Sequence, residues 1–303
     1  MSNARAANPE VLGERARIQT ERNIKDRLLD GLDTSVRRMS VGIKSRLRML
    51  VPRQLKKHRI LSGPLRGRWI VTSWQHYHTG ILGTTERGLM SWFHNNVKAG
   101  ETWLDIGANY GYTALAMQRL AGPDGRVFAF EPKLSTCGCL SQTMLLNRLP
   151  EVITVPMGLG SPESVELKRL VTIGGMVACG SKTVDEFRSR VREIAKSESL
   201  ETIAVARLDW LWPQICGYRN RVDGVKIDVQ GMELEVLKGM TEILKAHRPK
   251  LVVEIHAGID RGVLLGLLES CGYQRRGTPI YTVPGEEQGP QYYDNLSYAF
   301  SAK

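Results

Sequence analysis

The sequence predicts an α/β fold in which a mostly parallel sheet is covered by helices on both of its faces. Three observations lead to this prediction. Short apolar runs alternate with helix-like stretches between residues 102 and 270, and a glycine-containing turn directly follows the first run. No uninterrupted apolar run approaches the ~20 residues that a membrane-spanning helix needs. Such alternation is typical of parallel strands joined by right-handed helical crossovers, which restricts the topology to doubly wound orders.

The expected strands and helices follow one another along the main part of the chain. Strands are expected at residues 102–106, 126–130, 152–156, 222–228 and 251–255, and helices at 112–120, 135–147, 233–246 and 261–270. A further helix is expected at 86–97, and turn-forming glycines and a proline predict a small β entry at 61–85. Two strand-like stretches, 273–276 and 296–300, predict a terminal hairpin at the sheet edge.

One stretch, residues 161–206, interrupts this alternation. It contains three glycines and a charged, helix-like segment at 183–195. An insertion at this place could form part of a ligand pocket or could decorate the surface, and the sequence leaves both interpretations open. The chain of 303 residues is therefore expected to comprise a basic, partly helical extension at 1–60 and a main domain at 61–303 that carries the insertion.

Positive charge is concentrated in the first quarter of the chain. Residues 1–70 hold 17 Lys and Arg against 6 Asp and Glu, which accounts for the whole net charge of +11. Apolar residues within 35–50 recur at spacings of three and four, with basic residues over much of the remaining surface. Such a helix can lie on an anionic membrane, or it can pack against the main domain with its basic face in solvent. Because residues 71–303 carry no net charge and lack an aromatic-basic motif, nucleic acid is not an expected partner.

Cysteine usage and the first residues bear on the compartment. The five cysteines are odd in number and form no C-x-x-C pair, which argues against a disulfide framework or a zinc site. The first thirty residues are polar and lack the apolar stretch of a secretory signal. We therefore expect a reduced, cytoplasmic setting, with a peripheral position at the inner face of the membrane if the basic helix docks there.

A glycine-containing loop carries the strongest functional signal. It reads Asp105-Ile106-Gly107-Ala108-Asn109-Tyr110-Gly111 and stands between an expected strand and an expected helix. Glycines let the backbone turn sharply and approach a ligand, and open α/β sheets bind ligands at the carboxyl ends of their strands. Twenty residues after Gly111, Glu131 ends the second strand, where its carboxylate can accept both hydroxyl hydrogens of a ribose. The loop and Glu131 together predict a nucleoside-containing cofactor.

Asp105 distinguishes between two such cofactors. A nicotinamide dinucleotide prefers G-x-G-x-x-G, with helix N-terminal amides facing a pyrophosphate. Here the first position is a carboxylate, which a pyrophosphate would repel, whereas S-adenosylmethionine (SAM) carries an ammonium and a sulfonium. Asp105 therefore favours SAM. A dinucleotide-dependent oxidoreductase is the second hypothesis, and the structural alternative is that Asp105 only caps the following turn.

Four stretches resemble the FkbM-type SAM-dependent methyltransferases. They are Gly83-Thr84-Thr85-Glu86, Leu104-Asp105-Ile106-Gly107-Ala108-Asn109-Tyr110-Gly111-Tyr112, Val127-Phe128-Ala129-Phe130-Glu131-Pro132, and Val225-Lys226-Ile227-Asp228-Val229-Gln230-Gly231 through Gly239 to Glu254-Ile255-His256. The resemblance covers roughly residues 60–300 and agrees in order, spacing and identity. The family usually has Glu where Gln230 stands, so the role of that carboxylate in relatives is in question here.

The resemblance implies a Rossmann-like class I methyltransferase fold, with a seven-stranded, mostly parallel sheet and an antiparallel last strand. It also implies a set of cofactor-binding residues. Asp105, Gly107, Asn109 and Gly111, with Ala108 in the same loop, would surround the methionine part of SAM. Glu131 would hold the ribose hydroxyls, and Pro132 would lie near the adenine.

Three polar residues at the ends of the fourth and fifth strands are candidate catalytic residues: Asp228, Glu254 and His256. Positioning supplies much of the rate of methyl transfer, but an alcohol acceptor must also lose its proton or have its oxygen polarised by a metal. Asp228 could act as a base or a metal ligand, and a histidine, with an ordinary pKa of about 6.5, suits a base. Two carboxylates and one imidazole would also suit Mg²⁺ or Mn²⁺, so a divalent metal is left open.

These residues also have structural interpretations. Asp228 could cap the next helix, and Glu254 could pair with Lys226, because a lysine on a buried strand usually has a carboxylate partner. Before the main sheet, His76, Tyr77 and His78 could line an acceptor cleft. Trp210 and Trp212 could stack on a sugar, although core packing is more common for tryptophan.

The sequence thus predicts an enzyme that methylates a hydroxyl group with SAM. The expected acceptor is a small molecule or carbohydrate: a sugar, a glycolipid or a polyketide-type product. This acceptor class rests on the family resemblance. The alternatives are a nicotinamide-dependent oxidoreductase on the same sheet, and a membrane- or polyanion-docking module without catalysis.

Overall fold

The structure is a computed structural model that describes residues 52–163, 165–173, 176–178, 199–218, 220–280 and 296–303. The basic helix expected within 35–50 and the charged helix expected at 183–195 lie outside the described residues. None of the helices in the described ranges is long and apolar enough to cross a membrane.

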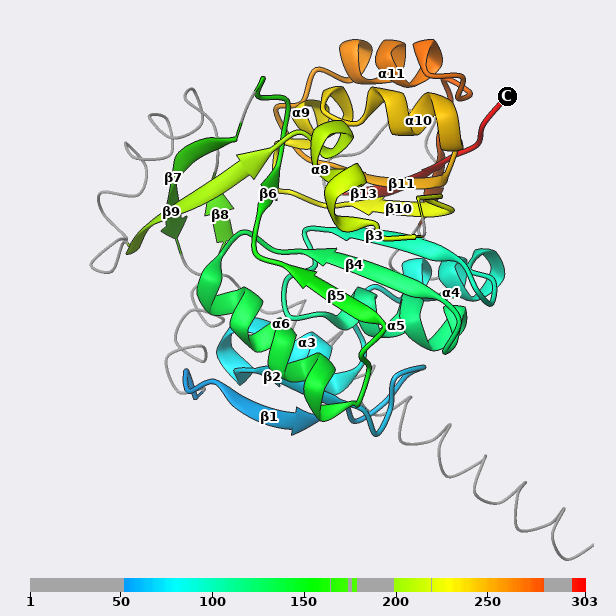
Figure 1. The fold of residues 1–303 in the computed structure, drawn as a ribbon. Helices are drawn as coiled ribbons and strands as arrows, with labels where there is room; N and C mark the ends of the chain where they lie inside the picture. Colours follow the sequence, from blue (N-terminus) through cyan, green and yellow to red (C-terminus); the bar gives the residue numbers. More distant parts are fainter. Residues whose placement is uncertain (1–51, 164, 174–175, 179–198, 219, 281–295) are drawn as a thin grey trace, which may run out of the picture.

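A seven-stranded sheet forms the centre of the main domain (Figure 1). Its order is β12-β13-β11-β10-β3-β4-β5, formed by β3 (Thr102–Ile106), β4 (Arg126–Phe130), β5 (Val152–Val155), β10 (Gly224–Ile227), β11 (Lys250–Ile255), β12 (Thr278–Ile280) and β13 (Leu296–Phe300). The five strands from β5 to β11 are parallel, and β13 runs antiparallel to both β11 and β12. The predicted mostly parallel sheet with an antiparallel last strand is confirmed.

Helices cover both faces of this sheet. One face carries α4 (Arg87–Asn96), α5 (Tyr112–Ala121) and α6 (Leu134–Leu146), and the other carries α8 (Leu208–Ile215), α9 (Glu233–Lys238), α10 (Thr241–His247) and α11 (Arg261–Ser270), as Figure 1 shows. Trp103 and Leu104, neighbours in β3, pack into the two separate cores. Because both faces of β3 are buried, all five of its side chains leave water, which explains why the strand is mostly apolar. A fully buried leucine contributes about 1.5–3 kcal/mol.

The region before the sheet differs from expectation. The β entry consists of β1 (Lys56–Arg59), which pairs antiparallel with β2 (Trp69–Thr72), and is followed by a helix, α3 (Trp74–Leu82). The side chain of Ser73 accepts a hydrogen bond from the backbone of His76 and so caps α3. The segment lacks a clear apolar repeat, and Tyr77 is non-helical inside it, so the periodicity gave no signal of a helix.

Two further expectations were wrong in detail. The single helix expected at 233–246 is two helices, α9 and α10, separated at Gly239, since glycine is a poor helix former. The strand expected at 273–276 is absent: Tyr273 makes only an isolated bridge to Ala302, and the edge strand β12 begins at Thr278. Tyr273 is buried, and its hydroxyl donates a hydrogen bond to the Pro249 carbonyl at 2.8 Å. An aromatic residue stands at this position because it fills the core, and not because it belongs to a strand.

The expected insertion contributes to a second, four-stranded sheet, which projects beside β5 (Figure 1). Its order is β6-β9-β7-β8, with β6 (Gly158–Leu159), β7 (Glu166–Ile173), β8 (Met176–Ala178) and β9 (Ser199–Ala206). Residues of β6 and β9 line a pocket together with residues at the ends of β3 and β4. This placement favours the ligand-pocket interpretation of the insertion. The division of the chain at residue 60 stays a prediction.

Candidate functional site

Asp105 and Lys226 form a buried ion pair at the carboxyl end of the sheet. The Asp105 side chain is fully buried; one oxygen accepts a 2.6 Å hydrogen bond from Thr113, and the other lies 3.5 Å from the Lys226 ammonium. Lys226 also donates to the Gly107 carbonyl at 3.2 Å and to Asp228 at 3.3 Å. Burial works to lower the pKa of Lys226, but these carboxylates outweigh burial and raise it. Lys226 therefore stays charged and ties β10 to the loop after β3, pairing with Asp105 and Asp228.

The loop after β3 is held close to both neighbouring strands. The backbone amides of Gly107 and Ala108 both donate to the Phe130 carbonyl at 3.0 Å, and Gly107 has a φ of +82°. A Cβ placed on Gly107 would lie 1.8 Å from the carbonyl oxygen of Asp228. Only glycine fits this position, because the backbones of β3 and β10 approach each other there.

Replacing Gly107 by alanine is expected to destabilise the fold by about 3 kcal/mol. Alanine would have to adopt a left-handed backbone conformation, and its Cβ would clash with the Asp228 carbonyl. For a domain of this size that corresponds to roughly 6–12 °C in melting temperature. The matched control is Gly258→Ala, since Gly258 has a φ of +90° but no heavy atom within 4 Å of the added Cβ. Thermal unfolding of both variants should show a much larger shift for Gly107→Ala; equal shifts would contradict the close approach.

Glu131 is oriented by two backbone amides at the end of β4. One carboxylate oxygen accepts from the Asn109 amide and the other from the Lys133 amide, both at 3.0 Å. Burial raises the pKa of Glu131 to about 7, although these two hydrogen bonds act in the opposite direction. Each carboxylate oxygen can accept more than one hydrogen bond, so both can still receive a hydroxyl hydrogen.

A small, mainly apolar pocket, called the slot below, is lined in part by Pro132, the residue after Glu131. The other lining residues include Gly107, Met157, Gly158, Val205 and Val229, which belong to or follow several different strands. Apolar walls on both sides of a slot suit a flat aromatic base. The slot, the Glu131 carboxylate and the loop after β3 thus adjoin one another at one edge of the sheet.

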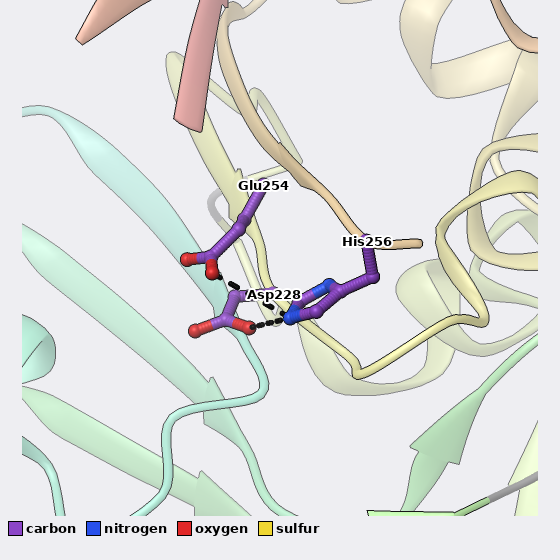
Figure 2. A group of neighbouring side chains, drawn as sticks. All are labelled: Asp228, Glu254 and His256. Carbon is purple, nitrogen blue, oxygen red and sulfur yellow. Dashed lines mark ion pairs between the residues drawn. The ribbon is translucent and has the colours of Figure 1, made fainter. Parts of the chain in front are cut away.

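The three candidate catalytic residues are brought together by β10 and β11. Figure 2 shows the side chains of Asp228, Glu254 and His256 pointing toward one another. The His256 Nε2 atom lies 3.5 Å from a Glu254 oxygen and 3.8 Å from Asp228 Oδ1. Asp228 does not cap α9, whose first residues have no side-chain cap from it. Its other oxygen faces Lys226, so the group adjoins the ion pair at the base of the loop.

Burial and neighbouring charges perturb two of these groups. Burial raises the pKa of Glu254, and the negative charges of Asp228 and Glu86 raise it further. Burial works to lower the pKa of His256, but its hydrogen bond to Glu233 and the nearby carboxylates outweigh burial and raise it. Burial acts in opposite directions on the two groups, whereas the negative charge of the neighbouring carboxylates raises both pKa values.

The sequence missed two residues of this neighbourhood. Glu233 at the start of α9 is fully buried and lies 2.7 Å from His256 Nδ1, although an acid in a first helical turn ordinarily lies in solvent. Glu86 carries part of the family resemblance, and its backbone has a φ of +52°. Burial raises its pKa, while the charge of Lys226 opposes the shift. The contact of Glu233 with His256 and the effect of the Glu86 charge on Glu254 both depend on how α9 and α4 pack on the sheet. The sequence alone therefore does not reveal them.

Gln230 also contacts the group. Its Nε2 donates to Asp228 Oδ1 at 3.3 Å, and its φ is +57°. A glutamate here would place a second negative charge against Asp228, whereas the amide donates a hydrogen bond to it.

The aromatic and histidine candidates from the sequence lie in different places: one packs on the loop after β3, and another belongs to the core. Tyr77 stacks on Tyr110 of the loop after β3, with ring centroids 5.7 Å apart. Trp212 is buried, packs edge to face on Phe128 at 4.9 Å and donates its indole hydrogen to a backbone carbonyl, so it is a core residue. Trp210 is 45% exposed. Tyr77 thus lies where it can shape the site, and the cleft-lining role of His76 and His78 stays a prediction.

Comparison with known proteins identifies similar chains. The family model described as the methyltransferase FkbM domain matches residues 105–275. The hexuronic acid methyltransferase AglP of Haloferax volcanii is 32% identical over 160 residues, which cover 52% of this chain and 56% of that relative. The chain therefore matches little more than half the length of this curated relative.

Solved structures were also matched. Methyltransferase FkbM from Methylobacillus flagellatus KT is 17% identical, with a TM-score of 0.44, over 69% of this chain and 50% of that one. Fibrillarin from Aeropyrum pernix, in complex with SAM, is 14% identical, with a TM-score of 0.41, over 84% of this chain and 86% of that one.

Proposed function

Because this chain belongs to the FkbM methyltransferase family, we propose that it transfers the methyl group of SAM to a hydroxyl group of a sugar. One observation carries the proposal. The predicted cofactor residues and the predicted catalytic residues adjoin at one edge of the sheet, where Lys226 contacts both Asp105 and Asp228. A cofactor and an acceptor held on the two sides of this ion pair would meet at the end of β3.

The cofactor half of the site suits SAM in each of its parts. Asp105, through Thr113 and Lys226, anchors the loop that would surround the methionine part of SAM, and Glu131 offers two oriented carboxylate oxygens to the ribose hydroxyls. The apolar slot beyond Glu131, lined in part by Pro132, suits the adenine. A nicotinamide dinucleotide fits less well, because its pyrophosphate would approach the buried carboxylate of Asp105.

The transfer half of the site can activate a hydroxyl group. In the transfer, the acceptor O–H bond breaks, a new bond forms between the oxygen and the methyl carbon, and the bond from that carbon to sulfur breaks. The electron pair stays on sulfur, which leaves S-adenosylhomocysteine. Asp228, Glu254 and His256 lie where they could polarise the hydroxyl or hold its proton.

The acceptor class is taken from the curated relative, which is named a hexuronic acid methyltransferase. We propose an acidic hexose, free or within a glycan. Methyl-labelled SAM should pass its label to an oligosaccharide that contains a hexuronic acid, and to a lesser degree to the matched neutral hexose. Binding of SAM without label transfer to any sugar would contradict the acceptor class and leave the cofactor proposal standing.

The affinity for SAM is expected to depend on pH through Glu131. The ionised carboxylate accepts ribose hydroxyl hydrogens best, and its pKa is about 7 without ligand. Affinity should therefore be full above pH 7 and weaken as the pH falls through 7, by about tenfold between pH 8 and pH 6. Calorimetric titration across this range measures the effect. The Glu131→Gln variant should bind weakly with little pH dependence, and a flat wild-type profile would contradict the role of Glu131.

A further inference from the structure

The space between Asp228, Glu254 and His256 has the dimensions of a cation site. One ligand atom of each residue lies within 4.8 Å of the other two, and His256 Nε2 lies 3.5 Å and 3.8 Å from the nearest carboxylate oxygens. These separations are long for hydrogen bonds. Ligand atoms bound at ~2.1 Å to one octahedral ion lie about 3.0 Å apart when adjacent and about 4.2 Å apart when opposite. The two separations from His256 Nε2, 3.5 Å and 3.8 Å, fall within that range.

His256 is fixed with one nitrogen aimed into this space. The residue is 8% exposed, and its Nδ1 lies 2.7 Å from an oxygen of Glu233, which is fully buried. That contact fixes the orientation of the ring and leaves Nε2 as the nitrogen directed away from Glu233. Figure 2 shows this nitrogen facing the carboxylates of both Asp228 and Glu254. A metal-binding histidine is oriented in the same way, by a carboxylate on its other nitrogen.

Charge balance also calls for a cation at this place. Three carboxylates, those of Asp228, Glu233 and Glu254, surround His256. Lys226 supplies one positive charge, but it is shared with the buried aspartate of β3. A divalent ion between these carboxylates would offset their mutual repulsion in a poorly hydrated site.

We propose that Asp228, Glu254 and His256 bind a divalent metal ion of the Mg²⁺ or Mn²⁺ class, and that Glu233 positions His256 for it. Carboxylate oxygens suit both ions, and the imidazole makes Mn²⁺ the better probe. Three protein ligands leave coordination positions free for two neighbouring sugar oxygens, one of them the reacting hydroxyl. This second part rests on the proposed function; metal binding itself does not. Coordination would acidify the hydroxyl, whose proton is then released to solvent as the methyl group transfers.

The test is titration of the full chain, freed of metal by chelation, with Mn²⁺ alone, followed by electron paramagnetic resonance of the unbound ion. We expect one saturable site per chain from the signal of the unbound ion, and nitrogen hyperfine coupling from His256 in the signal of the bound ion. The Glu233→Gln variant should weaken Mn²⁺ binding by about 10–100-fold, the usual effect of losing a carboxylate behind a ligating histidine. The Glu254→Gln variant should weaken it at least as much. The matched control is Glu269→Gln, an exposed residue of α11, which should bind like the wild type.

The Mn²⁺ titrations decide whether the metal site exists. Absence of saturable Mn²⁺ binding in the wild type, or equal binding in Glu254→Gln, would overturn it. SAM affinity and methyl transfer are measured on the same samples. Transfer that persists in the chelated enzyme would exclude the ion from the reaction while leaving the proposed function intact. Conversely, Mn²⁺ binding without SAM binding would overturn the proposed function and leave the metal site.

Discussion

Replacing Asp228 by asparagine is expected to lower the rate of methyl transfer by about 10³-fold while SAM still binds. Loss of a group that takes up a proton or holds a catalytic ion ordinarily costs about 10²–10⁴-fold. Asparagine keeps the size of the side chain, and Lys226 retains its partner Asp105, so the loop after β3 should stay in place. The turnover rate at saturating SAM and the SAM dissociation constant are the two quantities to measure.

The matched control is Asp260→Asn. Asp260 is the N-cap of α11 and accepts a hydrogen bond from the Val263 amide, and asparagine caps helices about as well as aspartate. This variant should keep the wild-type rate. Unchanged turnover in Asp228→Asn would remove Asp228 from the transfer step. Loss of SAM binding in it would instead move Asp228 to the cofactor half of the site.

Replacing Glu131 by alanine is expected to weaken SAM binding by about 100-fold or more. Two hydrogen bonds from ribose hydroxyls to a charged acceptor are lost, each worth about 1.5–3 kcal/mol, and each 1.4 kcal/mol is tenfold in affinity. The carboxylate also accepts the amides of Asn109 and Lys133, so its removal leaves two backbone donors without that partner.

Calorimetry distinguishes this role from a general loss of stability. Glu242→Ala, on the exposed side of α10, should leave SAM affinity unchanged. If Glu131→Ala binds SAM as tightly as the wild type, Glu131 does not contact the ribose. A lowered melting temperature with unchanged affinity would assign Glu131 to the stability of the loop.

The sequence predicted those parts of the fold in which local pattern and tertiary packing agree. β3, β4 and α11 lie at the expected residues, because short, mostly apolar runs mark the two strands and the Asp260 cap marks the start of the helix. α3 was missed, since the kink at Tyr77 breaks its repeat. The strand predicted at 273–276 was wrong, because Tyr273 packs in the core and makes only an isolated bridge.

The candidate site was predictable to a similar degree. Asp228, Glu254 and His256 follow neighbouring parallel strands, whose carboxyl ends meet at one sheet edge. Glu233 could not be found in this way, because it reaches His256 only through the packing of α9 on β11. The docking of the basic N-terminal helix on an anionic membrane stays a prediction, since residues 1–51 lie outside the described part of the chain.

The central claim is that the loop after β3 and Glu131 bind SAM. Its most direct test is calorimetric titration of the full chain with SAM, S-adenosylhomocysteine and NADH in parallel, with Glu131→Ala as the reference. We predict one site per chain for SAM and for S-adenosylhomocysteine, strongly weakened in Glu131→Ala, and no heat of binding with NADH. Binding of NADH without SAM would contradict the account and assign the same sheet to a nicotinamide-dependent oxidoreductase.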